Sequence, residues 1–179
     1  MFGEKKQEGV ITFYYDSEKL FNDVSLMSAY MTKNLASDNG SAMDEYNMSD
    51  DEHDVYEVCV RQTLPNIYEA IMKITSGVDK AFDDDVTVTA AGEDELGRAE
   101  GTYIEFNILN NDAYNDNVLN LADSTILNCL KYGVLSEFYS ICMHGELYKL
   151  AHDKFLTNLF QLKQRLFQLK KKKVVSQLS

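Results

Sequence analysis

The sequence predicts a mainly α-helical protein: a helical bundle with a long C-terminal αα-hairpin and an inserted antiparallel β-hairpin. Three observations lead to this fold class. The chain of 179 residues holds a single proline, residues 145–173 run without a proline or an internal glycine, and two short segments near the middle alternate like strands. The hydrophobic fraction of 45% and the charged fraction of 26% are ordinary for a globular protein. We therefore expect one helical domain over residues 1–179.

The chain opens with a predicted strand followed by a helix. Residues 10–15 (VITFYY) are β-branched and aromatic, which predicts a strand or an extended arm within residues 1–15. Asp16 or Ser17 can cap the next helix, whose apolar residues recur at helical steps to about Ala36. The acidic, polar residues 38–54 that follow are expected to form largely a mobile loop.

A second helix is predicted to begin near Asp50. Ser49 and Glu52 have the spacing of a capping box, in which each residue bonds the backbone amide of the other. Pro65 lacks an amide donor and clashes one turn back, so we expect a kink or break there before the helix resumes and ends at Gly77.

The inserted β-hairpin is predicted over residues 85–109. Apolar and polar residues alternate in residues 86–90 and again in residues 103–108, as in half-buried strands. Residues 92–101, between them, hold three glycines and a run of charges, so we expect an exposed, projecting tip. The tip residues expected to contact another protein are Glu93, Asp94, Glu95 and Arg98.

Two long helices complete the predicted bundle. The first, from about Val118 to Cys142, carries a wide apolar band in which Gly133 is expected to mark a close helix contact. Gly145 is expected to take the left-handed conformation that ends this helix. Residues 145–173 then form a long basic helix packed back as an αα-hairpin.

The last helix carries two apolar stripes. The first stripe, predicted to bind a partner, steps by four and three and consists of Phe155, Leu159, Leu162, Leu166 and Leu169. A stripe of this kind also commonly packs within its own domain, so an intramolecular core is the alternative. A second stripe of Leu156, Phe160 and Phe167 lies beside it, so one stripe can serve the core while the other serves a neighbour.

Charge is strongly asymmetric along the chain. The net charge is −12, but the residues from Lys149 onward carry +7 and the first 148 carry −19. The basic residues predicted to bind a partner are Arg165, Lys170, Lys171, Lys172 and Lys173, with Lys163 beside them. They can contact a nucleic-acid backbone or an acidic neighbour, or they can solubilise a helix end whose dipole favours cations. The acidic body disfavours DNA binding over the whole surface.

The titratable residues do not form a recognisable catalytic or metal site in the sequence. The three adjacent acids Asp83, Asp84 and Asp85 lack EF-hand spacing and are expected to lie in a solvated turn. His53 is expected to be solvated, His144 to suit a helix C-terminus, and His152 to be a hydrogen-bonded packing residue or a register mark between helices.

Neither a cofactor nor an enzymatic reaction is expected. Cys59, Cys129 and Cys142 show no CxxC or Cys/His spacing and are expected to be reduced core residues. No P-loop, HExxH, GxGxxG or GxSxG motif occurs. The first residues lack an apolar signal core and no segment has the length of a membrane span, so we expect a protein that does not bind membranes.

The order of elements resembles the head-to-tail connector (adaptor, or neck ring) proteins of tailed bacteriophages. The resemblance rests on residues 51–75, on the strand pair, and on residues 156–173 (LTNLFQLKQRLFQLKKKK). It implies a structural virion protein made in the host cytoplasm, a ring-forming homo-oligomer in the neck that docks to the portal and to other neck or tail proteins. DNA would cross the ring without sequence-specific binding.

Two other functional classes remain as alternatives. A small intracellular nucleic-acid-binding or regulatory protein would use the basic C-terminal helix on phosphate groups. An enzyme would use the acidic clusters with Mg²⁺ or Mn²⁺, and would show a metal-dependent shift in melting temperature.

Overall fold

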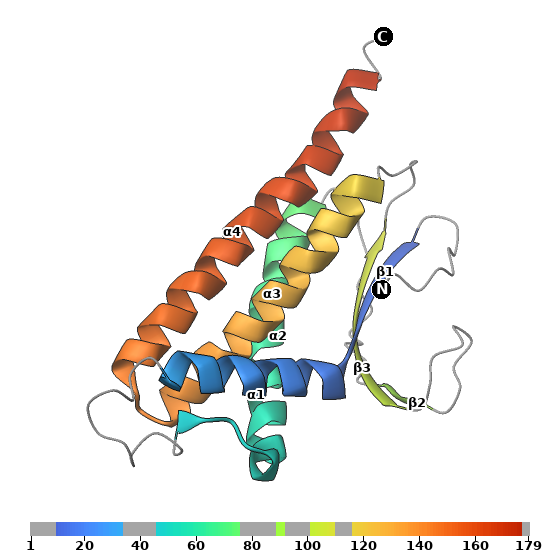
Figure 1. The fold of residues 1–179 in the computed structure, drawn as a ribbon. Coiled ribbons are helices and arrows are strands. Elements are labelled where there is room, and N and C mark those ends of the chain that lie inside the picture. Colours follow the sequence, from blue (N-terminus) through green and yellow to red (C-terminus); the bar gives the residue numbers. More distant parts are fainter. Residues whose placement is uncertain (1–9, 34–45, 76–88, 92–100, 110–115, 177–179) are drawn as a thin grey trace.

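The protein is a mainly α-helical bundle with a small antiparallel sheet on one side (Figure 1), which confirms the predicted fold class. The computed structural model describes residues 10–33, 46–75, 89–91, 101–109 and 116–176. The helices are α1 (Ser17–Lys33), α2 (His53–Thr75), α3 (Asp116–Ile141) and α4 (Gly145–Ser176), and the strands are β1 (Val10–Asp16), β2 (Thr89–Ala91) and β3 (Gly101–Leu109). The sheet and α4 lie on opposite sides of α2 and α3.

The sheet has the order β1-β3-β2, with both neighbours antiparallel to β3. The pair β2–β3 is the predicted hairpin, and β1 adds a strand that the hairpin prediction did not include. Phe13 pairs with Phe106 and Tyr15 with Ile104, and all four side chains are buried. Because residues two apart share a face of a strand, this face joins the helical core.

Polar contacts fix the N-terminal elements to α3. The Tyr15 hydroxyl donates a hydrogen bond of 2.8 Å to Asp123 Oδ1 on α3. Lys131 on α3 forms an ion pair of 2.6 Å with Asp23 on α1. The strand–helix unit β1–α1 is thus attached to the bundle at two points.

Both N-terminal helix starts follow the predicted capping. Asp16 Oδ1 accepts a hydrogen bond of 3.1 Å from the Lys19 amide at the start of α1. The Ser49 amide donates to Glu52 Oε2 at 2.8 Å, and a 3₁₀ turn at Asp50–Glu52 leads into α2. Of the kink or break expected at Pro65, the break does not occur, because α2 continues through this residue to Thr75.

Part of the expected loop before α2 is docked on α1. The Met48 amide donates to Ser28 Oγ at 3.0 Å, and the Ser25 hydroxyl donates to the Met48 carbonyl at 2.6 Å. The Met48 side chain is buried in the core. Residues 46–49 are therefore packed against α1, whereas residues 38–45 lie outside the described part and their predicted mobility stays a prediction.

Helices α3 and α4 form the predicted αα-hairpin, packed together along their length (Figure 1). Gly133 lies where α3 meets both α2 and α4. A Cβ atom on Gly133 would overlap the Thr63 Cγ2 atom of α2 and stand 3.0 Å from Phe155 Cε2 of α4. The close helix contact predicted at Gly133 is confirmed.

The turn between α3 and α4 uses a methionine where glycine is usual. Met143 has a φ of 55°, the left-handed conformation. The His144 amide bonds the Tyr139 carbonyl at 3.0 Å and the Met143 amide bonds that of Ser140 at 3.2 Å, which is the Schellman pattern. The left-handed residue expected at Gly145 is therefore Met143, and Gly145 is instead the first residue of α4.

Replacing this methionine should stabilise the protein. Met143→Gly is expected to raise the free energy of unfolding by roughly 0.5–1 kcal/mol, because glycine adopts this φ without steric cost. The exposed Met143 side chain contributes little packing that could be lost. Leu150→Gly, at an exposed position inside α4, is the control and should lower stability by roughly 1 kcal/mol in the same urea titration. Destabilisation by both substitutions would contradict the assignment of strain to Met143.

Candidate protein–protein interface

The first apolar stripe of α4 lies inside the protein. Phe155, Leu159, Leu162 and Leu166 are all buried in the core. The prediction that these side chains bind a partner is therefore wrong, since a partner cannot reach them in the folded chain. The side chain of Leu169, the fifth member of that stripe, lies outside the described residues.

The second apolar stripe of α4 faces solvent. The exposed fractions are 49% for Leu156, 61% for Phe160 and 56% for Phe167. Steps of four and seven residues place these side chains on one flank of the helix. We call this set the α4 stripe. Large apolar side chains grouped on one surface are typical of a site that binds another protein.

Two lysines and one aspartate, Asp153, lie on the same flank of the helix as the α4 stripe. Lys149 lies seven residues before Leu156, and Lys163 lies between Phe160 and Phe167, so both share its flank. The backbone stays helical through the predicted basic residues, and the end of α4 extends beyond the start of α3 (Figure 1). The side chains of Lys170, Lys171, Lys172 and Lys173 lie outside the described part, so their contacts stay a prediction.

Arg165 has an intramolecular role. Its Nη1 atom donates to the Leu121 carbonyl of α3 at 2.6 Å and to the Thr125 hydroxyl. Thr125 also bonds the same carbonyl at 2.6 Å, so one backbone oxygen holds both side chains. This guanidinium therefore joins α4 to α3 through Nη1, and the predicted contact of Arg165 with a partner stays a prediction.

The four hairpin-tip residues predicted to contact another protein, Glu93, Asp94, Glu95 and Arg98, lie outside the described residues. The acidic triplet Asp83–Asp84–Asp85 also lies outside them. The assignment of the four tip residues to a contact surface stays a prediction.

An acidic face of α2 was not recognised from the sequence. Asp51, Asp54 and Glu57 are exposed around Val58, whose exposed fraction is 46%. Arg61 lies one turn beyond Glu57 and forms an ion pair of 3.3 Å with it. The sequence did contain a pattern that predicts this face: Asp54 and Val58 are four residues apart and so lie on one side of the helix. We call the set of Asp51, in the 3₁₀ turn just before α2, and Asp54, Glu57 and Val58, on α2, the α2 acidic face.

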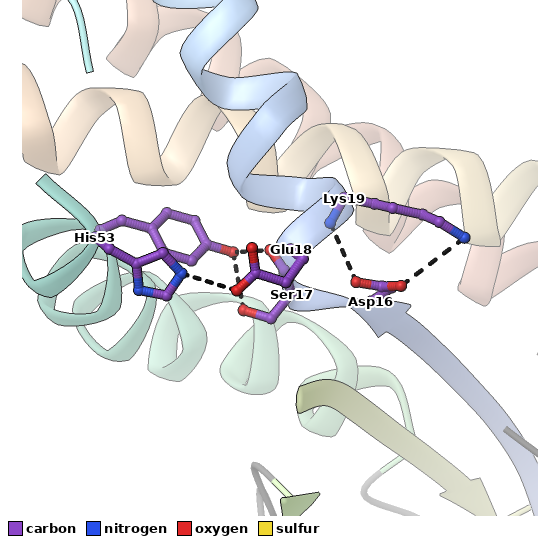
Figure 2. Close-up of polar contacts among 6 residues, drawn as sticks. Asp16, Ser17, Glu18, Lys19 and His53 are labelled. Carbon is purple, nitrogen blue, oxygen red and sulfur yellow. Dashed lines mark hydrogen bonds and ion pairs between the residues drawn. The ribbon is translucent and has the colours of Figure 1, made fainter. Parts of the chain in front are cut away.

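His53 is held between α1 and α2. Its Nε2 atom lies 3.0 Å from Glu18 Oε1 on α1 (Figure 2), and its ring lies 5.0 Å from that of Phe21 and 5.7 Å from that of Tyr56. The Tyr56 hydroxyl in turn donates to the Ser17 carbonyl at 2.9 Å. His53 therefore contributes to packing at this corner, which corrects the prediction that it is merely solvated.

Of the other two histidines, His144 lies just before the start of α4 and His152 lies between α4 and α3. His144 Nδ1 accepts a hydrogen bond of 3.3 Å from the Leu147 amide, so this side chain caps the start of α4. His144 also lies just after the C-terminus of α3, the helix end predicted for it, where its amide bonds the Tyr139 carbonyl. His152 Nδ1 lies 3.3 Å from the hydroxyl of Ser136 on α3, which confirms a hydrogen-bonded packing residue between the helices.

The buried thiols are poor nucleophiles. Burial raises the pKa of Cys59, with a smaller effect from Glu137, and burial alone raises that of Cys129; both reach about 12. Burial and Glu52 also raise the pKa of the half-buried Cys142. Because the thiolate is the reactive form, the three cysteines remain protonated and unreactive at neutral pH.

The buried hydroxyls of Tyr15, Tyr56 and Tyr139 also stay protonated. Burial raises the pKa of Tyr15, and the Asp123 carboxylate raises it further. Burial raises the pKa of Tyr56 and Tyr139 as well. The hydroxyls of Tyr15 and Tyr56 donate hydrogen bonds, whereas that of Tyr139 is buried without a partner among the described residues.

Within the described ranges, no group of three or more His, Cys, Asp or Glu side chains is placed to hold a metal ion. No described helix has the length and apolarity needed to cross a membrane. Comparison of the chain with protein-family models, with curated proteins and with solved structures found no match.

Proposed function

We propose that this protein is a structural subunit that acts by self-association and docking, as a ring-forming head-to-tail connector does between a portal and a tail. The exposed α4 stripe carries the proposal, because Leu156, Phe160 and Phe167 expose apolar surface that the chain's own core does not use. The layout resembling phage connectors supports the ring and its place in the neck of a virion. In this role the protein performs no catalysis, and DNA passes without sequence-specific contacts.

The oligomeric state in solution tests the proposal. The wild-type chain is expected to sediment as an oligomer, and Leu156→Ser/Phe160→Ser/Phe167→Ser as a monomer, because serine removes the apolar area that association buries. The matched control is Leu26→Ser/Tyr30→Ser, which alters two α1 side chains that are 59% and 63% exposed and should leave assembly unchanged. A wild-type chain that stays monomeric at every soluble concentration, or a triple variant that assembles normally, would refute the proposal.

A small nucleic-acid-binding or regulatory protein is the second candidate. The observation that favours it is the extension of helical backbone to Ser176, past the four consecutive lysines. In this class the chain would bind DNA in a salt-dependent way, and changing Lys170, Lys171, Lys172 and Lys173 to Glu would abolish the binding. The connector proposal instead predicts that the wild-type chain makes no sequence-specific contact with DNA, so these substitutions have no such contact to abolish.

A further inference from the structure

We propose that the α4 stripe of one copy docks on the α2 acidic face of the next copy. This inference rests on the proposed self-association and names the surface that receives the stripe. The receiving surface must offer apolar area to Leu156, Phe160 and Phe167 and negative charge to Lys149 and Lys163.

Pairing of α4 with a second α4 is disfavoured by charge. Lys149 and Lys163 lie on the same flank as the stripe and outnumber Asp153, the exposed acid three residues before Leu156, so two facing stripes would both be net positive. The whole segment from Lys149 onward carries +7, which adds to this repulsion. The partner surface should therefore come from the part of the chain that carries −19.

The α2 acidic face has the complementary chemistry. Val58 is an exposed apolar side chain at the C-terminal end of this set; Asp54 lies one helical turn before it, and Asp51 lies in the 3₁₀ turn that leads into α2. Neither aspartate forms an ion pair with another residue in the described part of the chain, whereas the charge of Glu57 is offset by Arg61. Asp51 and Asp54 thus leave negative potential beside an apolar contact point.

The exposed face of α1 fits less well. Leu26 and Tyr30 are also exposed there, but Lys19 and Lys33 lie at the two ends of the same face. The α1 carboxylate of Asp23 is already paired with Lys131. A basic stripe approaching this face would meet cations.

The α4 stripe and the α2 acidic face are different patches of one chain, so the contact between copies is heterologous. Each copy offers α4 to one neighbour and α2 to the other. Such contacts generate a closed ring when the rotation closes and an open filament when it does not. The inferred contact therefore has the symmetry that a ring subunit requires.

Two charge-reversed chains test this pairing. The first chain carries Lys149→Glu and Lys163→Glu on α4, and the second carries Asp51→Lys and Asp54→Lys in the α2 acidic face. Each chain alone should assemble with a dissociation constant raised roughly tenfold or more, because like charges then face each other. An equimolar mixture should restore assembly, since every interface in an alternating oligomer pairs opposite charges. Lys33→Glu on α1 is the control and should assemble like the wild type.

The outcomes separate the two proposals. Failure of the mixture to assemble, with each chain folded by circular dichroism, overturns the α4–α2 pairing. If the serine variants of the α4 stripe still abolish oligomers in that case, self-association through α4 stands and another acidic surface receives it. A wild-type chain that never associates overturns both.

Discussion

Leu162→Ala is expected to lower the free energy of unfolding by about 2–5 kcal/mol, the usual cost of removing a fully buried leucine side chain. The Leu162 side chain has no exposed surface, and it lies between Leu159 and Leu166 on the core side of α4. Truncation therefore loses both the transfer free energy of three carbons and the contacts around the cavity. Urea titration followed by circular dichroism measures the change.

Phe160→Ala is the matched control for this prediction. Phe160 is two residues away on the same helix and 61% exposed, so its truncation should change the stability of the monomer by no more than about 0.5 kcal/mol. The pair separates the two stripes: one substitution acts on folding, the other on association. Equal losses of stability from both would mean that the assignment of the stripes to core and surface is wrong.

Gly133→Ala is expected to destabilise the protein by about 1–3 kcal/mol even though alanine is the better helix former. The added methyl group would overlap Thr63 Cγ2, so α2 and α3 must move apart where α4 also packs through Phe155. The gain in helix propensity offsets only roughly 1 kcal/mol of this cost. Thermal and urea unfolding should both report the loss.

Thr63→Ala should rescue the Gly133 variant. The Thr63 hydroxyl is buried without a hydrogen-bond partner among the described residues, so its removal alone should be close to neutral. In the double variant both methyl groups fit, and the double-mutant cycle should give a coupling of about 1–3 kcal/mol. A cycle with no coupling would show that the Gly133 variant fails for a reason other than this contact.

The sequence was sufficient for the helices and for the close contact at Gly133, since periodicity and glycine placement are local signals. It could not decide which stripe of α4 is buried. Leu162 and Phe160 both lie on stripes with helical spacing, and the choice depends on how α3 and α2 pack against the helix. That information is tertiary, so the stripe with the better heptad pattern was wrongly predicted to bind a partner.

At three positions the local preference of the residue was not enough to predict its role. Pro65 stays inside α2, Met143 takes the conformation assigned to Gly145, and the Arg165 guanidinium bonds α3. A long basic side chain near a run of lysines looks available for a partner. Only the position of the Leu121 carbonyl reveals that Arg165 already has an acceptor.

The pairing of β1 with β3 also constrains the order in which the elements of the protein can fold. Asp16 at the end of β1 pairs with Tyr103, which is 87 positions later in the chain. During synthesis from the N-terminus, β1 is made long before the central strand that it joins. The aromatic residues Phe13 and Tyr15 must therefore wait for β3, whereas α3 and α4 can pack as soon as their short turn is formed.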